Sequence, residues 1–260
     1  MLASRIFDTV KACISPVAIL ILWELAVGLR LINGEFLPAP SEIMRALIDL
    51  GPDVVLPELW ASLLRIAIGF GLAAVLGVLA GSWMAVDERV NAFLYPILGS
   101  TYAIPKSAFI PLFILWFGLG FWPIVLVVFI ACILPIVVYT FHGVSEVPKL
   151  RIWSARSFGV SGLDLFWSVR RPAAMPQILV GMRIAIGFAF TVAISAEMIV
   201  STTGLGKLIF IYGEGGVYAP MFAVIGVLLA VAFLADLLFQ RLSDRHLSWV
   251  ESRPKAGDLS

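Results

Sequence analysis

The chain has 260 residues, of which 61% are hydrophobic and only 13% are charged, and its mean hydropathy is +1.02. Soluble domains typically carry about 25% charged residues, and a helix that is apolar on all sides needs lipid or a very large core around it. A chain of this length cannot build so large a core, so the composition excludes an ordinary water-soluble domain and predicts an integral membrane protein. The net charge of +1 gives no reason to expect a nucleic-acid partner.

Apolar segments long enough to cross a bilayer recur along the chain. A helix needs about 20 apolar residues to span the hydrocarbon core, and backbone polar groups there must bond within their own segment. The sequence therefore predicts an all-α, polytopic fold with about six transmembrane helices. The predicted spans cover residues 14–31, 62–86, 104–119, 123–141, 178–200 and 220–240.

The segments between the first spans are less regular. The first apolar run is expected to be retained as a helix, because no small-residue cleavage site follows it. Residues 33–61 hold four prolines and are predicted to form a long loop. Pro96, Pro105 and Pro111 interrupt the region of the third span, which leaves a separate interfacial helix at residues 92–103 as an alternative.

The distribution of Lys and Arg predicts the orientation in the membrane. If the N-terminus is cytoplasmic, twelve of the 18 basic residues fall in cytoplasmic segments and three in external ones, while Arg65, Lys106 and Arg183 fall within spans. We therefore expect a cytoplasmic N-terminus at residues 1–13, a transmembrane domain at 14–240 and a cytoplasmic tail at 241–260. The transmembrane domain would include a cytoplasmic loop at 142–177.

The cytoplasmic loop is too long and too regular for a simple connector. Ser161 followed by Asp164 predicts a capping box at the start of a helix. Pro172 is expected to end that helix, since proline cannot continue the backbone hydrogen bonding. The loop is thus predicted to hold two short helices that meet at a turn formed by Gly159 and Gly162.

Large apolar side chains mark the same two helices. Leu163, Phe166 and Trp167 follow helical spacing and form one apolar stripe, and Trp153 and Phe158 precede them. Such a patch is costly to expose to water. Either the helices form an interfacial hairpin without a partner in the headgroup region, or they bind another protein.

The spacing within the loop matches a known signature in part. Ala155 and Gly159 are followed by nine residues, then Val169, and Pro172 closes the pattern. This pattern resembles the cytoplasmic signature of binding-protein-dependent ABC importer permeases, which reads Glu-Ala-Ala, two or three residues, Gly, nine residues and Ile-x-Leu-Pro. The sequence departs from it at Trp153, Ser154 and Arg171. Further segments similar to the nitrate, sulfonate and taurine branch of this family lie in order at residues 36–41, 62–65, 104–105, 111–120, 171–176, 181–183, 196–198 and 204–206.

The resemblance implies a type I ABC importer permease in the bacterial cytoplasmic (inner) membrane, for a small anionic solute such as a sulfonate, taurine or nitrate. Its partners would be a second copy of the chain, two cytoplasmic ATP-binding subunits, a periplasmic or lipid-anchored solute-binding protein, and membrane lipid. ATP and Mg would be used by the partner ATPase, and this chain would bind no cofactor directly; its sequence has no Gly-x-x-x-x-Gly-Lys-Ser/Thr phosphate loop. The residues implied in ATPase coupling are Ala155, Gly159, Ser161, Gly162, Leu163, Phe166, Trp167, Val169 and Pro172.

Charged residues inside spans are costly in lipid, so they are candidates for the pore or its gates. Glu197 is expected either to cap the Gly-rich turn that holds Gly204 and Gly206 or to line an external gate. These two glycines are therefore counted among the gate candidates.

The basic residues within spans are further pore candidates. Arg65 is expected to face headgroups rather than the solute path, and Arg183 to extend its side chain to the cytoplasmic headgroups. Lys106 is expected at the cytoplasmic mouth. Glu24, in the first span, would need a partner or protonation.

Small residues recur in the second span. Ala73, Gly77 and Gly81 are spaced by four residues, which predicts close helix packing. The partner helix belongs either to the same chain or to a second copy.

Two other classes of function are alternatives to a transporter subunit that works with an ATPase. A membrane-embedded enzyme would need paired acids, a His cluster or a Ser/Lys dyad at membrane depth, and the sequence offers none. A secondary carrier or channel would commonly carry inverted repeats with broken helices, and no convincing repeat is found. Cys13 and Cys132 are expected to be free thiols, and no metal-ligand spacing is found.

Overall fold

The computed structural model describes residues 15, 17–102 and 104–247. These residues form helices and their connections, with no strand among them, so the all-α prediction is confirmed for this part of the chain. Residues 1–13, which hold Cys13, and the tail beyond residue 247 lie outside the described residues. The helices are Val17–Gly28, α2 (Pro40–Val86), α3 (Glu88–Tyr102), α4 (Ile110–Phe117), α5 (Phe121–Ser145), α6 (Lys149–Ser157), α7 (Gly162–Leu165), α8 (Arg171–Val200), α9 (Leu205–Glu214) and α10 (Tyr218–His246). A 3-10 turn, Lys106–Phe109, precedes α4, and a π-helical turn, Phe166–Arg170, precedes α8.

Four helical segments are long and apolar enough to cross a membrane: α2, α5, the run Gly162–Val200 and α10. They contain the second, fourth, fifth and sixth predicted spans. The third predicted span corresponds to the segment Lys106–Phe117, and α3 covers most of the separate helix considered for residues 92–103. The two meet at 96° and count as one span only when taken together. The described part of the first is the shorter apolar helix Val17–Gly28. By length and composition, the described residues therefore hold four or five spans.

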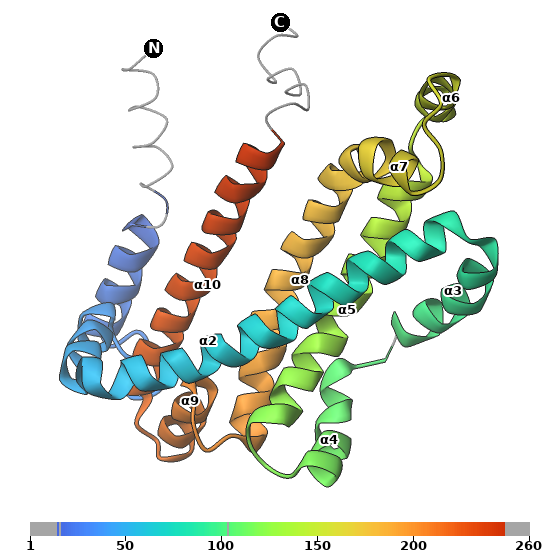
Figure 1. Cartoon of the computed structure of the whole chain (residues 1–260). Coiled ribbons are helices and arrows are strands. Elements are labelled where there is room, and N and C mark those ends of the chain that lie inside the picture. Colours follow the sequence, from blue (N-terminus) through green and yellow to red (C-terminus); the bar gives the residue numbers. More distant parts are fainter. Residues whose placement is uncertain (1–14, 16, 103, 248–260) are drawn as a thin grey trace, which may run out of the picture.

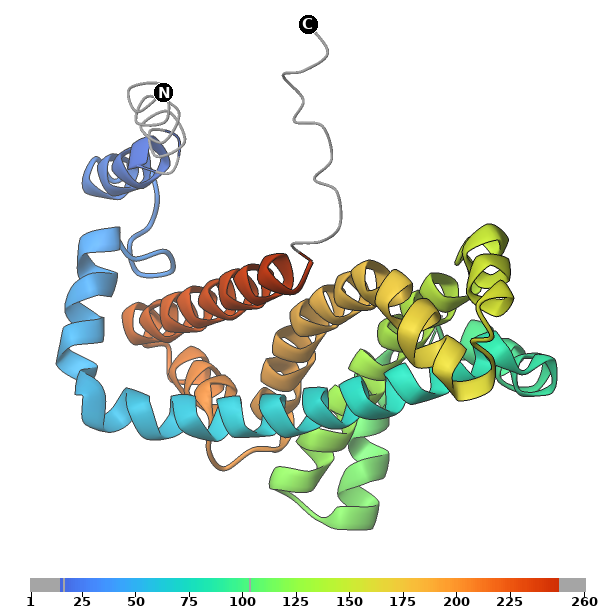
Figure 2. The same ribbon diagram turned by 45° about the horizontal axis from the view of Figure 1, so that its top comes forward.

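The loop predicted for residues 33–61 is wrong, because α2 already begins at Pro40 and has 47 residues. Pro57 lies inside the helix, whereas two other prolines lie where a helix tolerates them. Pro40 is at the helix start, and Pro52 follows Gly51, whose φ of +68° breaks the helix into two segments. Figure 2 shows the N-terminal part of α2 turned away from the rest of the helix at this kink.

The core of the molecule is α5, packed between α2 and α8 (Figure 1). The small residues of α2 lie against α5 within the same chain, which resolves the alternatives for their packing partner. A Cβ added at Gly81 would lie 2.5 Å from the carbonyl oxygen of Val137 on α5. On the other side of α5, a Cβ at Gly181 of α8 would lie 2.6 Å from Cβ of Tyr139. The glycines let the backbones of α2 and α8 approach α5 closely, and α5 therefore lies between the other two helices.

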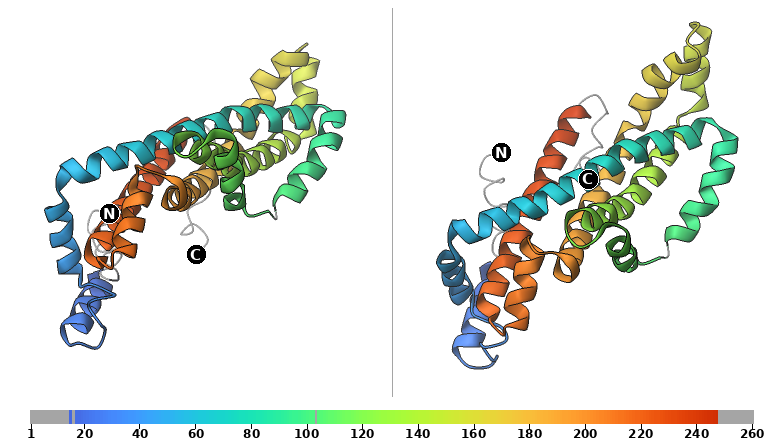
Figure 3. Two further views of the ribbon diagram at one scale, coloured as in Figure 1. Left: turned by 90° about the horizontal axis from the view of Figure 1, so that it is seen from below. Right: turned by 60° about the horizontal axis from the view of Figure 1, so that its bottom comes forward.

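The predicted cytoplasmic loop projects from one end of this bundle. Both views of Figure 3 show α6 and α7 reaching past the other helices. The C-terminal end of α10 lies at the same end of the molecule (Figure 1). The helices α4 and α9 lie toward the opposite end of the bundle (Figure 1).

Candidate functional site

The first candidate site is the exposed hairpin, which we define as residues 149–170, from α6 through the π-helical turn. Its two helices meet at a turn in which Gly159 and Gly162 have φ values of +83° and +57°, a region that favours glycine. The predicted helix–turn–helix is therefore present, with the backbone N–H of Val160 donating to the carbonyl of Ala155 at 3.1 Å. Ser161 is the residue that precedes α7, but its side chain makes no capping hydrogen bond, so the predicted capping box is wrong.

Pro172 does not end the second helix, contrary to the sequence expectation. Helical backbone continues from Gly162 to Val200, and Pro172 lies in the first turn of α8. The π-helical turn comes directly before it, where the N–H of Arg171 donates to the carbonyl of Phe166. The exposed hairpin is thus joined to the span α8 by helical backbone without a loop.

One side chain of the apolar stripe packs at the base of the hairpin, and the other two lie on its surface. Phe166 is half-buried and packs with Val144 and Ile178 at the base of the hairpin. Leu163 and Trp167 point outward, with exposed fractions of 77% and 56%. Exposed apolar side chains on the hairpin are Leu150, Trp153, Phe158, Leu163 and Trp167. Of the remaining coupling candidates, Ala155, Val169 and Pro172 are half-buried, and Gly159, Ser161 and Gly162 are exposed.

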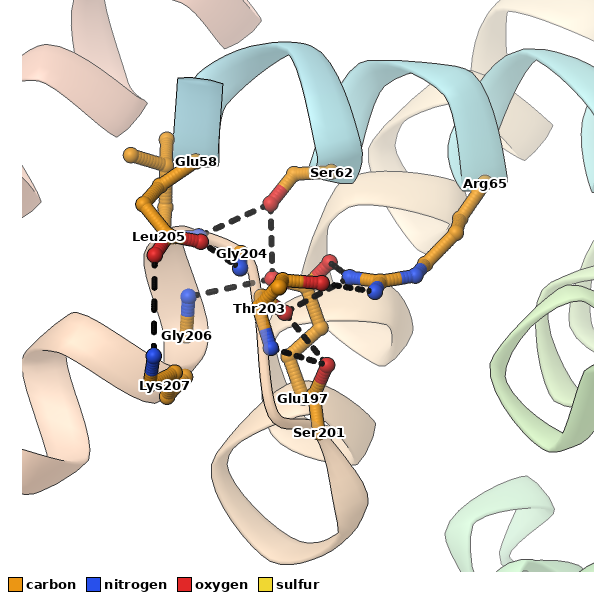
Figure 4. A network of polar contacts seen from close by, with 10 residues as sticks. All are labelled: Glu58, Ser62, Arg65, Glu197, Ser201, Thr203, Gly204, Leu205, Gly206 and Lys207. Atoms are coloured by element: carbon orange, nitrogen blue, oxygen red, sulfur yellow. Dashed lines mark hydrogen bonds and ion pairs between the residues drawn. The ribbon is translucent and has the colours of Figure 1, made fainter. Parts of the chain in front are cut away.

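The second candidate site is a buried charge network between α2, α8 and the turn before α9 (Figure 4). Its centre is an ion pair in which Arg65 of α2 lies 2.7 Å from Glu197 of α8. Both side chains are almost fully enclosed, at 5% and 0% exposure. The expectation that Arg65 faces headgroups is therefore wrong: its guanidinium points into the protein, where a carboxylate is available.

Glu197 also holds the Gly-rich turn, which is the capping alternative considered from the sequence. Its carboxylate accepts hydrogen bonds from the hydroxyl of Ser62 at 2.7 Å and from the backbone N–H of Gly206 at 3.0 Å. Arg65 donates to the carbonyl and hydroxyl oxygens of Thr203 at 2.8 and 2.6 Å. A Cβ at Gly204, whose φ is +116°, would lie 2.5 Å from the Glu197 carboxylate. The turn can therefore approach the ion pair only where it has glycine.

Two members of this network were not singled out from the sequence. Glu58 accepts a hydrogen bond from the N–H of Gly204 and lies 3.6 Å from Lys207. Ser62 accepts one from the N–H of Leu205 at 2.9 Å. Their spacing in the sequence could have identified them. Glu58, Ser62 and Arg65 recur at intervals of four and three residues and therefore share one face of α2.

Of the remaining charged candidates, Arg183 and Lys106 depart from the sequence expectations and Glu24 meets its expectation. Arg183 does not extend to headgroups; it donates two hydrogen bonds of 2.8 Å to Asp236 of α10. Lys106 does not lie at the mouth of the bundle but lines a cavity with Pro135 and Thr191, near the middle of α5 and α8. Glu24 has the partner it needed, because the hydroxyl and N–H of Ser41 donate to it at 2.7 and 3.0 Å.

A bundle of apolar spans with a buried charge network and a projecting hairpin (Figure 3) is the architecture of a multi-span membrane protein. The family described as "Binding-protein-dependent transport system inner membrane component" matches residues 73–248, and the chain belongs to this family. It is 32% identical to the taurine transport system permease protein TauC of Escherichia coli, over 92% of this chain and 90% of that protein. It is 30% identical to the formylaminopyrimidine transport permease protein ThiX of Halalkalibacterium halodurans, over 94% of this chain and 98% of that protein.

The fold is that of a type I ABC importer permease. A chain of the MetNI methionine ABC transporter in an inward-facing conformation superposes with a TM-score of 0.64 at 20% identity, over 74% of this chain and 95% of that chain. Family and fold agree, so the protein is the permease subunit of an ABC importer in the inner membrane.

Proposed function

We propose that two copies of this chain form the translocation path of an ATP-driven importer, and that each copy binds one cytoplasmic ATP-binding subunit through its exposed hairpin. A periplasmic or lipid-anchored binding protein delivers the solute at the opposite end of the bundle. Both chain ends then face the cytoplasm, in keeping with the bias of Lys and Arg. ATP and Mg are used by the partner subunits, and this chain carries no catalytic residue.

The observation that carries this proposal is the set of large apolar side chains on the exposed hairpin. The set has five members, and the same segment also holds Lys149, Arg151, Arg156 and Arg170. Contiguous apolar surface of this kind marks a protein or membrane contact. A helix that inserts into a groove of a partner protein would bury such residues and leave the basic ones at the rim.

Continuous backbone gives the hairpin a direct mechanical connection to the bundle. Movement of a bound ATPase would displace α7, and helical backbone transmits the displacement to α8. At its base, Phe166 packs against Val144 at the end of α5, so α5 would move with it. Rigid-body movement of packed elements can then switch the path between inward-open and outward-open states.

The solute we propose is small and anionic, such as a sulfonate, taurine or nitrate. The name of one relative refers to taurine, and that protein and this chain align over nearly their full lengths. Lys106 lines a cavity together with Pro135 of α5 and Thr191 of α8, and a basic residue in such a lining is compatible with an anionic solute.

Replacing Leu163 by Asp is expected to reduce co-purification of the ATP-binding subunit by tenfold or more and to abolish ATP-driven uptake. A charge at this exposed apolar position would have to be buried without a partner when the subunit binds. The measurement is the amount of ATPase retained on the affinity-tagged permease, together with uptake into vesicles.

Leu119→Asp is the matched control, because Leu119 is also exposed, at 71%, but lies at the opposite end of α5. It should retain the ATPase subunit. Retention of the subunit by Leu163→Asp would contradict the proposed contact. Transport by the purified chain alone, driven by an ion gradient, would instead indicate a secondary carrier.

A further inference from the structure

A cavity of about 390 Å³ lies at the base of the exposed hairpin. Its lining comes from three parts of the chain: Val86 at the end of α2, Arg156 near the end of α6, and residues between 162 and 170, in α7 and the π-helical turn. Ligand-binding cavities are commonly about 300–1,000 Å³ in volume, so this one can hold more than water. A ligand bound here would contact the span α2 and both helices of the hairpin at once.

The charges in this lining are all positive. They belong to Arg156 and Arg170, and neither guanidinium forms a hydrogen bond or an ion pair with the residues that the structure describes. Asp87 directly follows Val86, but its carboxylate already accepts hydrogen bonds from two backbone N–H groups of α3. Asp164 of α7 is exposed and lies outside the lining. The two arginines therefore make this cavity a place for an anion.

Arg170 carries the strongest indication of a missing ligand. Its side chain is half-buried, and its Nε is enclosed by protein without a hydrogen-bond partner. A cation that loses hydration without gaining a partner costs free energy, and an anion in the adjoining cavity would offset that cost. Arginine suits phosphate in particular, because its planar fork can donate two parallel hydrogen bonds.

The cavity lies where a span reaches the membrane surface. Val86 is the last residue of α2, and Trp83, one turn earlier, is 61% exposed. Tryptophan is enriched where spans meet the lipid headgroups. The lining next to the arginines is apolar, with Val86, Leu165 and Phe166. Basic pockets beside spans on the cytoplasmic side bind anionic headgroups, and the apolar residues here can contact the glycerol and the first methylene groups.

An acidic side chain of the ATP-binding subunit is the alternative occupant. The surface that we propose for this subunit consists of Leu150, Trp153, Phe158, Leu163 and Trp167, and of these only Leu163 lines the cavity. Leu165 is buried, and Phe166 packs at the base of the hairpin against Val144. The cavity thus lies on the side of the hairpin that adjoins the bundle, which favours lipid.

We propose that the cavity between Arg156 and Arg170 binds the phosphodiester group of an anionic phospholipid, such as phosphatidylglycerol. The bound headgroup bridges α6, the π-helical turn and the end of α2, and so holds the hairpin in one position relative to the bundle. A stiffened hairpin transmits movement of the ATPase better than a loose one, so uptake depends on anionic lipid. This inference goes beyond the proposed function, because the lipid site lies within the permease and needs no ATP.

The test uses the full complex of permease, ATPase and binding protein. Arg156→Gln combined with Arg170→Gln should lower the phosphatidylglycerol retained by the purified complex about fivefold or more, measured by mass spectrometry of the extracted lipid. The corresponding double change to Lys should stay within about threefold of the original, because it keeps both charges. In phosphatidylcholine vesicles, adding an equal amount of phosphatidylglycerol should raise ATP-driven uptake several-fold for the original complex and much less for the Gln variant.

Arg241→Gln combined with Arg245→Gln is the matched control, since it removes two exposed arginines from α10 at the same end of the molecule (Figure 1). It should leave lipid retention unchanged. An equal loss of lipid in both double variants would overturn the site, because attraction to the membrane surface in general would then explain it.

Two further measurements separate the lipid from other anions. If the Arg156→Gln and Arg170→Gln variant retains its lipid but loses the ATPase subunit, the cavity holds an acidic group of that subunit and the proposal fails. It also fails if inorganic phosphate, and not phosphatidylglycerol, raises the thermal midpoint of the delipidated complex. Stabilisation by phosphatidylglycerol that the Gln variant lacks is the expected result.

Discussion

Replacing Glu197 by Gln is expected to destabilise the folded permease by about 3–5 kcal/mol, because it leaves the buried charge of Arg65 without its counter-charge. The side chain keeps its size, so the change isolates the loss of charge from a change in packing. The thermal midpoint of the complex, followed by size-exclusion chromatography after heating, should fall by on the order of 10 °C.

The matched control is Glu146→Gln, which changes the same kind of residue at an exposed position after α5. It should leave the midpoint unchanged. Replacing both partners, as in Arg65→Met with Glu197→Met, should recover a large part of the loss, since neither charge then remains buried. A double variant whose loss equals the sum of the losses of Arg65→Met and Glu197→Met, each measured alone, would refute the pairing as the source of stability.

Replacing Gly81 by Ala is expected to lower the stability of the fold, although alanine is the better helix former by about 1 kcal/mol. The new methyl group would lie 2.5 Å from the carbonyl oxygen of Val137 and 2.8 Å from Cβ of Thr140. Both are held by the helix α5, so α2 and α5 must separate. Overpacking of this kind costs about 1–3 kcal/mol, and Gly81→Leu should abolish recovery of folded protein.

Gly71→Ala provides the comparison within the same helix. Nothing lies within 4 Å of a Cβ at Gly71, so only the gain in helix propensity remains. The thermal midpoint should therefore stay the same or rise for Gly71→Ala and fall for Gly81→Ala. Equal shifts of the same sign in both variants would disprove the close contact between α2 and α5.

The spans themselves could be predicted because their signal is local. An apolar run of sufficient length must be helical in lipid, and residues 123–141 and 178–200 indeed lie inside α5 and α8. The turn at Gly159 and Gly162 was also evident, since glycine spacing and helical periodicity are read from neighbouring residues. The errors over residues 33–61 and at Pro172 came from treating proline as a helix terminator, whereas the structure places Pro40, Pro52 and Pro172 in the first turns of helical segments.

The sequence by itself determined the class of environment, the helical spans, the exposed hairpin and the residues that a lipid-facing surface cannot hold. Only the tertiary structure decided which of those residues meet. Arg65 and Glu197 are 132 positions apart, and their pairing depends on α2 crossing the end of α8. The same holds for Arg183 with Asp236, and for Lys106 beside the middle of α5. The physical reason is that helical periodicity fixes the face on which a side chain lies, whereas its partner is set by the packing of helices, which depends on contacts between distant segments.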